Sequence, residues 1–263
     1  MTENAEATRS AAPTEAWLSV IVPVFENEST IAELHRRVCA SVGERLCQMV
    51  FVDDASPDGS REAIDAAAET DRRVERLSLA RNCGQHRAVL HGMDRARGRW
   101  TVVMDADLQD PPEAIPALIE RAGASGADVV FAGRRGSYES PLRLLTSRLF
   151  KRLLARGCGV PPDAGMFFVC NRSAIERVTA LAGPPPFVVA MIGRAGLRID
   201  SVPVNRSRRP SGPSSYGSAM RLGSAARGLM WSFRRRTGAL AAPEVKLDPP
   251  REETAVADSL PGP

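Results

Sequence analysis

The stretch Thr101-Val-Val-Met-Asp105-Ala-Asp107-Leu-Gln109-Asp110-Pro-Pro-Glu113 is the most informative part of this chain. Thr101 to Met104 predicts a buried strand, because it is apolar, contains β-branched residues and stops at charge. Alternate residues of an extended segment point the same way, so we expect Asp105, Asp107 and Gln109 to converge. Their oxygen atoms suit Mg²⁺ or Mn²⁺, which keep coordination positions for water and substrate phosphates. The stretch therefore predicts a metal–diphosphate site at a strand end.

Helix capping is the structural alternative for the same acids. Asp110-Pro-Pro-Glu113 has the composition of a helix start, where acidic residues stabilise the first turn. An Asp-x-Asp pair alone does not distinguish a capping role from a ligand role. The two interpretations must be separated by the rest of the chain.

Predicted strands and helices alternate along the first half of the chain. Strands are expected at 18–25, 49–52, 74–79, 101–104 and 128–132, and helices at 29–42, 61–70, 85–97 and 113–122, the first entered through a Ser/Thr cap. This alternation predicts an α/β fold with a mostly parallel, doubly wound sheet and helices on both faces. Sites in such sheets form at the carboxyl ends of strands. We expect the following residues to line one site: Asp53, Asp54, Arg81, Asn82, Asp105 and Asp107.

The second half of the chain is less regular. Helices are expected at 141–156, from Ser173 onward and over about 218–234, with short strands at 166–169 and 202–204. We expect one domain over residues 17–236, with a nucleotide-binding half (17–135) and an acceptor half (136–236). Residues 1–16 and 237–263 are expected to be disordered tails, because they are polar or rich in Pro and acids.

Cysteine usage and hydropathy indicate a cytoplasmic protein. The five cysteines form no Cys-x-x-Cys pair, so we interpret them as reduced thiols. The polar N-terminus does not resemble a secretory signal, and no apolar run approaches the roughly 18 to 20 residues of a membrane span. The chain is therefore not expected to cross a membrane by itself.

Basic residues are concentrated in two segments. Residues 194–236 contain ten arginines and one acid, Asp200, and residues 141–160 contain five basic residues and no acid. Such segments attract phosphates, nucleic acid or anionic lipid. Nucleic-acid binding is disfavoured, because no aromatic residues for base stacking accompany the arginines.

Five motifs in order give the chain a resemblance to a known family. They are Val22-Pro-Val-Phe-Glu-Asn-Glu28, Val52-Asp-Asp-Ala-Ser-Pro-Asp-Gly59, Arg81-Asn-Cys-Gly-Gln-His86, Met104-Asp-Ala-Asp-Leu-Gln-Asp-Pro-Pro-Glu113 and Arg209-Pro-Ser-Gly-Pro-Ser-Ser-Tyr216. From residue 18 to about 230 the chain resembles family 2 glycosyltransferases with the GT-A (Rossmann-like) fold. Within that family it is most similar to polyprenyl-phosphate glycosyltransferases, including the dolichyl-phosphate mannosyltransferase type.

The resemblance implies roles in binding a nucleotide-sugar donor. Asp53 or Asp54 would read the nucleobase and ribose. Pro23 and Glu28 lie beside that acid in the family, and Arg81 and Gly84 fall where a loop passes the nucleotide. Asp105, Asp107 and Gln109 resemble the ligands of Mg²⁺ or Mn²⁺ and diphosphate, and Arg209 resembles an arginine that closes over the diphosphate, with Gly212 as its hinge. The resemblance thus assigns catalytic roles to Asp107 and Arg209.

Simpler interpretations exist for some of these residues. Asp53 and Asp58 lie in a sequence that favours turns anyway. The alternative for Arg209 is a solvated charge, because Arg206 and Arg208 are also candidates for its role.

The family resemblance implies transfer of a hexose with inversion by direct displacement. A hydroxyl acceptor needs a general base, whereas a phosphate acceptor is already an anion and needs only positive charge to hold it. Candidate acceptor contacts are Arg134, Arg135, Arg143, Arg148 and Ser214. The chain departs from its relatives at Gly165-Met-Phe-Phe168, where many carry Gly-Asp-Phe-Arg, and at Ser215, where many carry lysine. Asp163 is the candidate to replace the missing acid.

The acceptor and the membrane association are left open by the sequence. The segment 220–236 predicts a basic amphipathic helix that would lie on an anionic bilayer or pack on the domain. We expect a cytoplasmic enzyme, soluble or peripherally attached, acting on a polyprenyl phosphate. The alternatives are a soluble hydroxyl acceptor and a catalytically inactive scaffold that binds nucleotide sugar. A nucleotidyltransferase is disfavoured, because Pro23 to Glu28 is not a Gly-rich basic loop.

Overall fold

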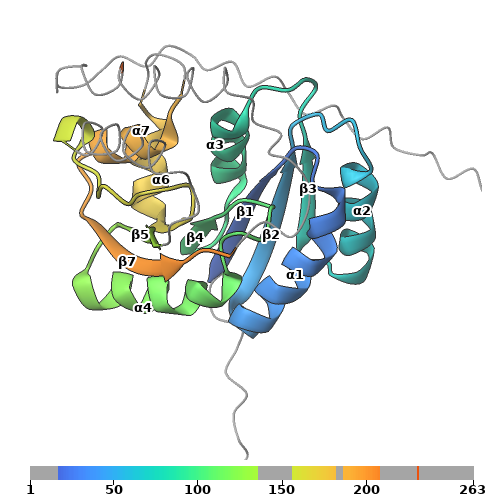
Figure 1. Cartoon of the computed structure of the whole chain (residues 1–263), viewed down its shortest axis with the longest axis horizontal. Coiled ribbons are helices and arrows are strands. Elements are labelled where there is room, and N and C mark those ends of the chain that lie inside the picture. Colours follow the sequence, from blue (N-terminus) through green and yellow to red (C-terminus); the bar gives the residue numbers. More distant parts are fainter. Residues whose placement is uncertain (1–16, 136–155, 182–185, 208–229, 231–263) are drawn as a thin grey trace, which may run out of the picture.

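The computed structural model describes residues 17–135, 156–181 and 186–207, together with Met230. Its strands form a seven-stranded sheet in the order β3-β2-β1-β4-β6-β5-β7 (Figure 1). The strands are β1 (Leu18–Val24), β2 (Leu46–Asp53), β3 (Val74–Ser78), β4 (Trp100–Val103), β5 (Val129–Arg135), β6 (Phe168–Asn171) and β7 (Ile199–Asn205). Strands β1, β2 and β4 are apolar and buried along nearly their whole length, as parallel strands covered on both faces must be.

The sheet is mostly parallel, which confirms the predicted fold class. Strand β1 pairs in parallel with β2 and β4, β2 pairs in parallel with β3, and β5 pairs in parallel with β7. Strand β6 lies between β4 and β5 and is antiparallel to both. The carboxyl ends of β1, β2, β3 and β4 therefore lie at one edge of the sheet, which we call the carboxyl edge.

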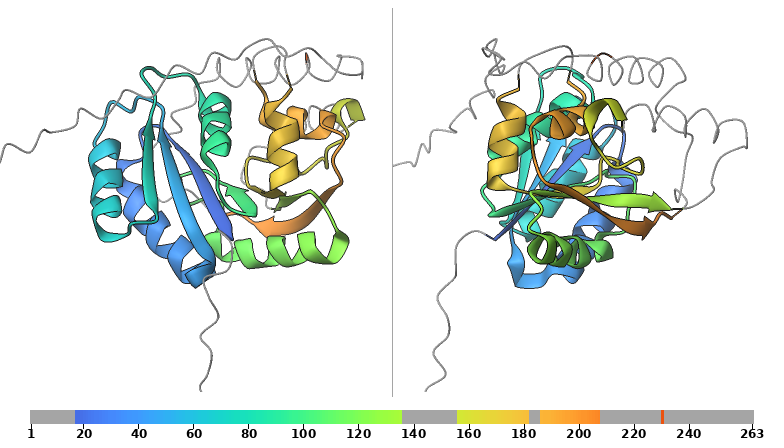
Figure 2. Two further views of the ribbon diagram at one scale, coloured as in Figure 1. Left: turned by 180° about the vertical axis from the view of Figure 1, so that it is seen from behind. Right: turned by 90° about the vertical axis from the view of Figure 1, so that its left-hand side faces the viewer.

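Helices cover both faces of the sheet (Figures 1 and 2). They are α1 (Glu28–Val42), α2 (Ser60–Thr70), α3 (Gln85–Arg95), α4 (Ile115–Ser125), α6 (Arg172–Thr179) and α7 (Val188–Arg194), with short 3₁₀ turns η1 (Gly43–Arg45) and η2 (Pro112–Ala114). One apolar core joins the sheet to α1, α2 and α4, and a second joins it to α3, α6 and α7. Adjacent strand residues alternate between the two cores: Val20 and Val22 enter the first, and Ile21 enters the second.

Helix α1 shows why these segments are helical. Its buried apolar residues, Ile31, Leu34, Val38 and Val42, recur at intervals of three or four and form one stripe. The expected Ser/Thr cap is wrong: the N-cap is Asn27, and its side chain makes no capping bond. The helix begins instead where the backbone leaves strand β1 through Glu26, which has a positive φ of 56°.

Two other expectations are corrected by the structure. The helix predicted over 113–122 consists of the 3₁₀ turn η2 followed by α4, which begins only at Ile115. Helix α7 was not predicted, because Val188 to Gly193 are buried on every side and show no amphipathic period.

Several sequence predictions lie outside the described residues. These are the tails at 1–16 and 237–263, nearly all of the helix at 141–156, and the basic segment from Arg208 onward apart from Met230. Among the helices that are described, none is both long enough and apolar enough to span a membrane.

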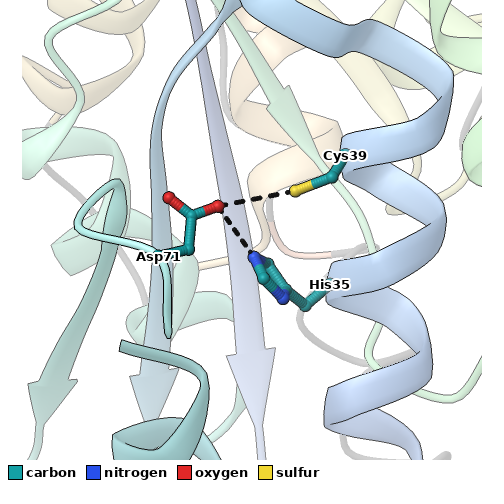
Figure 3. A group of neighbouring side chains, drawn as sticks. All are labelled: His35, Cys39 and Asp71. Carbon is teal, nitrogen blue, oxygen red and sulfur yellow. Dashed lines mark hydrogen bonds and ion pairs between the residues drawn. The ribbon is translucent and has the colours of Figure 1, made fainter. Parts of the chain in front are cut away.

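A partly buried polar network joins α1 to the loop before β3, at the edge opposite the carboxyl edge. Asp71 Oδ2 accepts hydrogen bonds from His35 Nε2 at 3.0 Å and from Cys39 Sγ at 3.6 Å (Figure 3). These three side chains are spaced closely enough to hold a metal ion. However, the Arg73 guanidinium already bonds Asp71 Oδ2 at 2.7 Å and Cys39 Sγ at 3.5 Å. The cation of this network is an arginine, so we interpret it as structural.

Replacing Asp71 by Asn is expected to lower the free energy of unfolding by about 2 kcal/mol at pH 7. The hydrogen bond and charge of Arg73 hold the pKa of Asp71 well below its usual value. The Asp71 carboxylate therefore stabilises the fold above the unfolded-state pKa of about 3.9, and this stabilisation is lost as the pH falls below it. Urea unfolding of wild type and Asp71→Asn measures the difference in their free energies of unfolding. A range of about pH 3 to 7 brackets the unfolded-state pKa.

Asp65→Asn is the matched control, because Asp65 also pairs with an arginine, Arg76, but its side chain is 47% exposed. That variant should lose less than about 1 kcal/mol. Equal losses for Asp65 and Asp71 at pH 7 would contradict the structural role given to the Asp71 network.

Candidate functional site

Unusual backbone conformations gather at the carboxyl edge. In the described residues, the non-glycine residues with positive φ are Glu26 at 56°, Ala55 at 57° and Leu108 at 58°. They follow β1, β2 and β4 respectively. Such conformations cost on the order of 1 kcal/mol or more each and occur most often at functional sites. These conformations therefore indicate the carboxyl edge as the candidate site.

The loop before α3 is fastened to the end of β2 by one buried carboxylate. Asp54 Oδ1 accepts the backbone N–H of Cys83 at 2.6 Å, and Asp54 Oδ2 accepts that of Gly84 at 2.8 Å. Burial raises the pKa of Asp54, while the two N–H groups lower it, with a net rise. Gly84 has φ 85°, a conformation suited to glycine, and it caps α3.

The neighbouring carboxylate, Asp53, is only partly engaged. Its Oδ1 accepts the N–H of Ser56 at 2.9 Å, and the side chain is fully buried. Within the part of the chain that the structure describes, Asp53 Oδ2 has no hydrogen-bond partner, and the half-exposed Arg61 places Nη2 3.6 Å from it. A buried acceptor with unused capacity is uncommon and points to a missing ligand or water.

Helix α3 carries the connection onward to β4. Its first residue, Gln85, donates a short hydrogen bond from Nε2 to Asp105 Oδ1. Asp105 follows β4 by two residues, and Asp107 lies nearly buried in the turn that comes next. The ends of β2 and β4 and the start of α3 are thus joined by side-chain bonds, and the sequence predicted this juxtaposition from topology alone.

The expected extended arrangement of Asp105, Asp107 and Gln109 is wrong. Strand β4 ends at Val103, and the chain turns through Leu108 with positive φ. Gln109 donates its backbone N–H to Asp107 Oδ1 at 3.1 Å, so the segment folds back on itself. Alternation along a strand therefore gives no reason for the three side chains to converge.

An arginine directly after β7 completes the cluster. Arg206 donates Nε to Asp110 Oδ1 at 2.6 Å and Nη2 to Asp110 Oδ2 at 2.9 Å, and its Nη2 lies 3.8 Å from Asp105 Oδ2. Burial lowers the pKa of Arg206, but Asp110, Asp105 and Asp107 together outweigh burial and hold that pKa above its usual value. The backbone adds a further link, since Ser207 N–H donates to the Gln109 carbonyl at 2.9 Å.

Helix capping does not explain these acids. The N-caps of η2 and α4 are Pro111 and Ala114, and neither helix start has a side-chain cap bond. Asp110 is directed to Arg206 rather than to the helix. The acids after β4 therefore form a charged cluster, which we call the edge cluster: Asp105, Asp107, Asp110, Arg206 and Gln85.

The donor set of the edge cluster fits a divalent cation with oxygen preference. Asp105 and Asp107 offer carboxylate oxygens, and Mg²⁺ is commonly held by one or two carboxylates together with substrate phosphates. Among the described residues, the His/Cys/Asp/Glu group of three with metal-binding spacing is the one at His35, not the edge cluster. The edge cluster would supply only part of a coordination sphere and would leave the rest to a phosphate ligand.

The remaining predicted donor residues are placed as follows. Pro23 is buried within β1, and Glu28 starts α1, where its Oε2 accepts the N–H of Gly59 at 3.2 Å. Arg81 is exposed in the loop that Asp54 fastens. Arg209 lies outside the described residues. The sequence did not single out Gln85 or Asp110, and it favoured Arg209, with Arg206 only as a further candidate.

The predicted acceptor residues are only partly described. Asp163 Oδ2 accepts the Ser201 hydroxyl at 3.1 Å. Arg134 belongs to β5, and Arg143, Arg148 and Ser214 lie outside the described residues. The altered Gly165–Phe168 segment is buried: Phe168 is 0% exposed and packs at 5.5 Å between ring centroids on Phe131. The positions where many relatives carry an acid and an arginine here belong to the core.

Replacing Asp54 by Ala should lower the free energy of unfolding by about 2 kcal/mol, because two N–H groups lose their acceptor. Asp53→Asn is the control: the amide oxygen still accepts the Ser56 N–H, so the expected loss is below about 1 kcal/mol. Urea unfolding measures both. A smaller loss for Asp54→Ala than for Asp53→Asn would contradict the fastening role of Asp54.

Replacing Phe168 by Arg, the residue common in relatives, should destabilise the fold rather than restore an acceptor contact. The side chain is fully buried in the second core, and an unpaired buried charge is among the few changes that cost about 4 kcal/mol or more. Thermal unfolding tests this, with Phe168→Leu as the apolar control. A well-folded Phe168→Arg protein would show that this position is open to the site.

Comparison with known proteins identifies the family. Glycosyl transferase family 2 matches residues 19–179. The chain is 40% identical over 211 residues to undecaprenyl-phosphate 4-deoxy-4-formamido-L-arabinose transferase of Pseudomonas paraeruginosa, covering 78% of this chain and 61% of that protein. The protein of the same name from Pseudomonas fluorescens is 35% identical over 210 residues, with the same coverage. The chain thus spans about three-fifths of the length of these relatives.

Solved structures agree on the fold. Glucosyl-3-phosphoglycerate synthase of Mycobacterium tuberculosis, solved with Mn²⁺, UDP-glucose and phosphoglyceric acid, aligns with a TM-score of 0.63 at 20% identity, covering 82% of this chain and 79% of that one. The mannosyltransferase PcManGT of Pyrobaculum calidifontis, solved with GDP-Man and Mn²⁺, aligns with a TM-score of 0.59 at 21% identity, covering 88% and 67%. These likenesses confirm the GT-A fold, and the chain belongs to glycosyl transferase family 2.

Proposed function

We propose that this chain transfers a sugar from a nucleotide-diphosphate sugar to a polyprenyl phosphate with the help of Mg²⁺ or Mn²⁺. The observation that carries the proposal is the edge cluster, in which Asp105 and Asp107 leave β4 beside the loop fastened by Asp54. The names of the two relatives, 40% and 35% identical, support a polyprenyl phosphate as acceptor. Those names also give an arabinose derivative, so the proposal is not restricted to the hexose expected from the sequence.

The carboxyl edge offers separate positions for the parts of a donor. We assign the base or ribose to Asp53, because both carboxylate oxygens of Asp54 already accept hydrogen bonds, from the N–H groups of Cys83 and Gly84. A ligand reaches Asp53 Oδ2 by displacing the Arg61 side chain, which is 51% exposed. The diphosphate is assigned to Asp105 and Asp107 through a divalent cation, which neutralises the charge that develops on the leaving nucleoside diphosphate.

The displacement needs no general base when the acceptor is a phosphate. A phosphate oxygen of the acceptor forms a bond to the anomeric carbon as the bond from that carbon to the donor diphosphate breaks. The buried Met166 and Phe168 bring neither acid nor arginine to the site, which suits an acceptor that is already ionised. Arg206 lies within reach of Asp105 and adds positive charge on the side where the diphosphate would lie.

Replacing Asp107 by Ala should lower the rate of sugar transfer by about 100-fold or more, because charge stabilisation at the leaving group is lost. The assay follows radiolabel from UDP- and GDP-sugars, including a 4-deoxy-4-formamido-arabinose donor, into undecaprenyl phosphate extracted with organic solvent. Asp94→Ala, which removes an exposed carboxylate at the far end of α3, should keep full activity.

Label that enters the organic phase only with metal and intact Asp107 would support the proposal. Metal-dependent donor binding with label only in water-soluble product would overturn the lipid acceptor in favour of a hydroxyl acceptor, with Asp163 as the candidate base. Donor binding without transfer to either acceptor would instead indicate an inactive nucleotide-sugar-binding scaffold.

A further inference from the structure

Arg206 is held in place by a buried carboxylate. Its guanidinium makes a two-bond contact with Asp110, whose side chain is 2% exposed, while Arg206 itself is 17% exposed. Removing one partner of a buried ion pair is strongly destabilising, so the pair resists separation. The bond from Ser207 N–H to the Gln109 carbonyl holds the two backbones together as well.

This fixed cation lies in the electric field of the carboxylates that would hold a metal. Arg206 Nη2 is 3.8 Å from Asp105 Oδ2, and Asp107 also stabilises the charge of Arg206. A divalent cation that binds Asp105 and Asp107 must come close to the guanidinium, and the repulsion between like charges is large at such separations outside bulk water. The pair of carboxylates is therefore partly neutralised before any metal arrives.

We propose that Arg206 is a positioning residue that weakens divalent-cation binding at Asp105 and Asp107 until a donor diphosphate is present. The negative diphosphate offsets the repulsion between the metal and the guanidinium, so metal and nucleotide bind cooperatively. Such coupling is reciprocal, because a nucleotide that strengthens metal binding must itself bind more strongly when the metal is there. The cooperativity with nucleotide rests on the proposed function, because it needs the proposed donor site. The effect of Arg206 on the affinity for metal alone does not depend on that site.

The direct test is Mn²⁺ binding to the full chain without nucleotide, measured by titration calorimetry and by the electron paramagnetic resonance signal of free Mn²⁺. Arg206→Gln should bind Mn²⁺ about tenfold more tightly than wild type, or more, and tenfold corresponds to about 1.4 kcal/mol. Arg206→Lys keeps the charge and should stay within about threefold of wild type, a difference under 1 kcal/mol. Arg121→Gln, which removes an arginine paired with Asp200 on the surface, should change nothing.

Arg206→Gln takes the arginine charge away from the buried Asp110 carboxylate. A second pair of variants removes that carboxylate charge from both proteins. Asp110→Asn and Asp110→Asn/Arg206→Gln differ only in the arginine. The double variant should bind Mn²⁺ about tenfold more tightly than Asp110→Asn. Equal or weaker Mn²⁺ binding after removal of Arg206, in either background, would overturn the proposal.

Repeating the titrations with UDP or GDP separates this inference from the proposed function. In wild type, nucleotide should strengthen Mn²⁺ binding. In Arg206→Gln, the ratio of Mn²⁺ affinities with and without nucleotide should be smaller than in wild type. The decrease should be about the factor by which the substitution tightens Mn²⁺ binding without nucleotide. If Arg206→Gln tightens Mn²⁺ binding but neither nucleotide has any effect on any variant, the role of Arg206 toward the metal stands and the proposed donor site fails. Undiminished coupling in Arg206→Gln would overturn the cooperative part of the inference.

Discussion

The organisation of the site depends on one buried carboxylate. Asp54 directly follows β2 and accepts the backbone N–H groups of both Cys83 and Gly84, which fixes where α3 begins. Because α3 begins there, Gln85 reaches Asp105 at the end of β4. A parallel sheet brings the ends of strands to one edge, but this contact sets how the loops at that edge lie relative to one another. Without it, the loop before α3 would have no side-chain link to β2.

Two polar networks lie at opposite edges of the sheet. At the edge opposite the carboxyl edge, Arg73 neutralises Asp71 and satisfies its oxygens together with His35 and Cys39, so this network is complete without a ligand. At the carboxyl edge, Arg206 pairs with Asp110 and lies 3.8 Å from Asp105. In our proposal Asp105 and Asp107 also hold a divalent cation, so similar residue types would serve stability at one edge and ligand binding at the other.

The sequence was sufficient for the fold and for the sheet edge at which the candidate residues gather, but not for the geometry there. Apolar runs such as Val20 to Val22 and the periodic stripe of α1 predicted the elements, because burial leaves a clear pattern. Helix α7 left no such pattern, since all its faces are buried. The extended backbone expected over Asp105, Asp107 and Gln109 was wrong, because β4 ends at Val103 and Leu108 turns the chain. The contact of Arg206 with Asp110 could not be predicted, because the two residues are far apart in the sequence.

Hydrogen exchange of backbone amides, with and without UDP or GDP plus Mn²⁺, tests most directly whether the carboxyl edge is the donor site. If the carboxyl edge is the donor site, we expect slower exchange at Cys83 and Gly84 and over 105–110 when nucleotide and metal are both present. The loops at 43–45 and 71–73, at the opposite edge of the sheet, should be unchanged and serve as the internal control. Protection of the opposite edge, or no protection at 105–110 despite measurable nucleotide binding, would contradict the assignment of the donor site to the carboxyl edge.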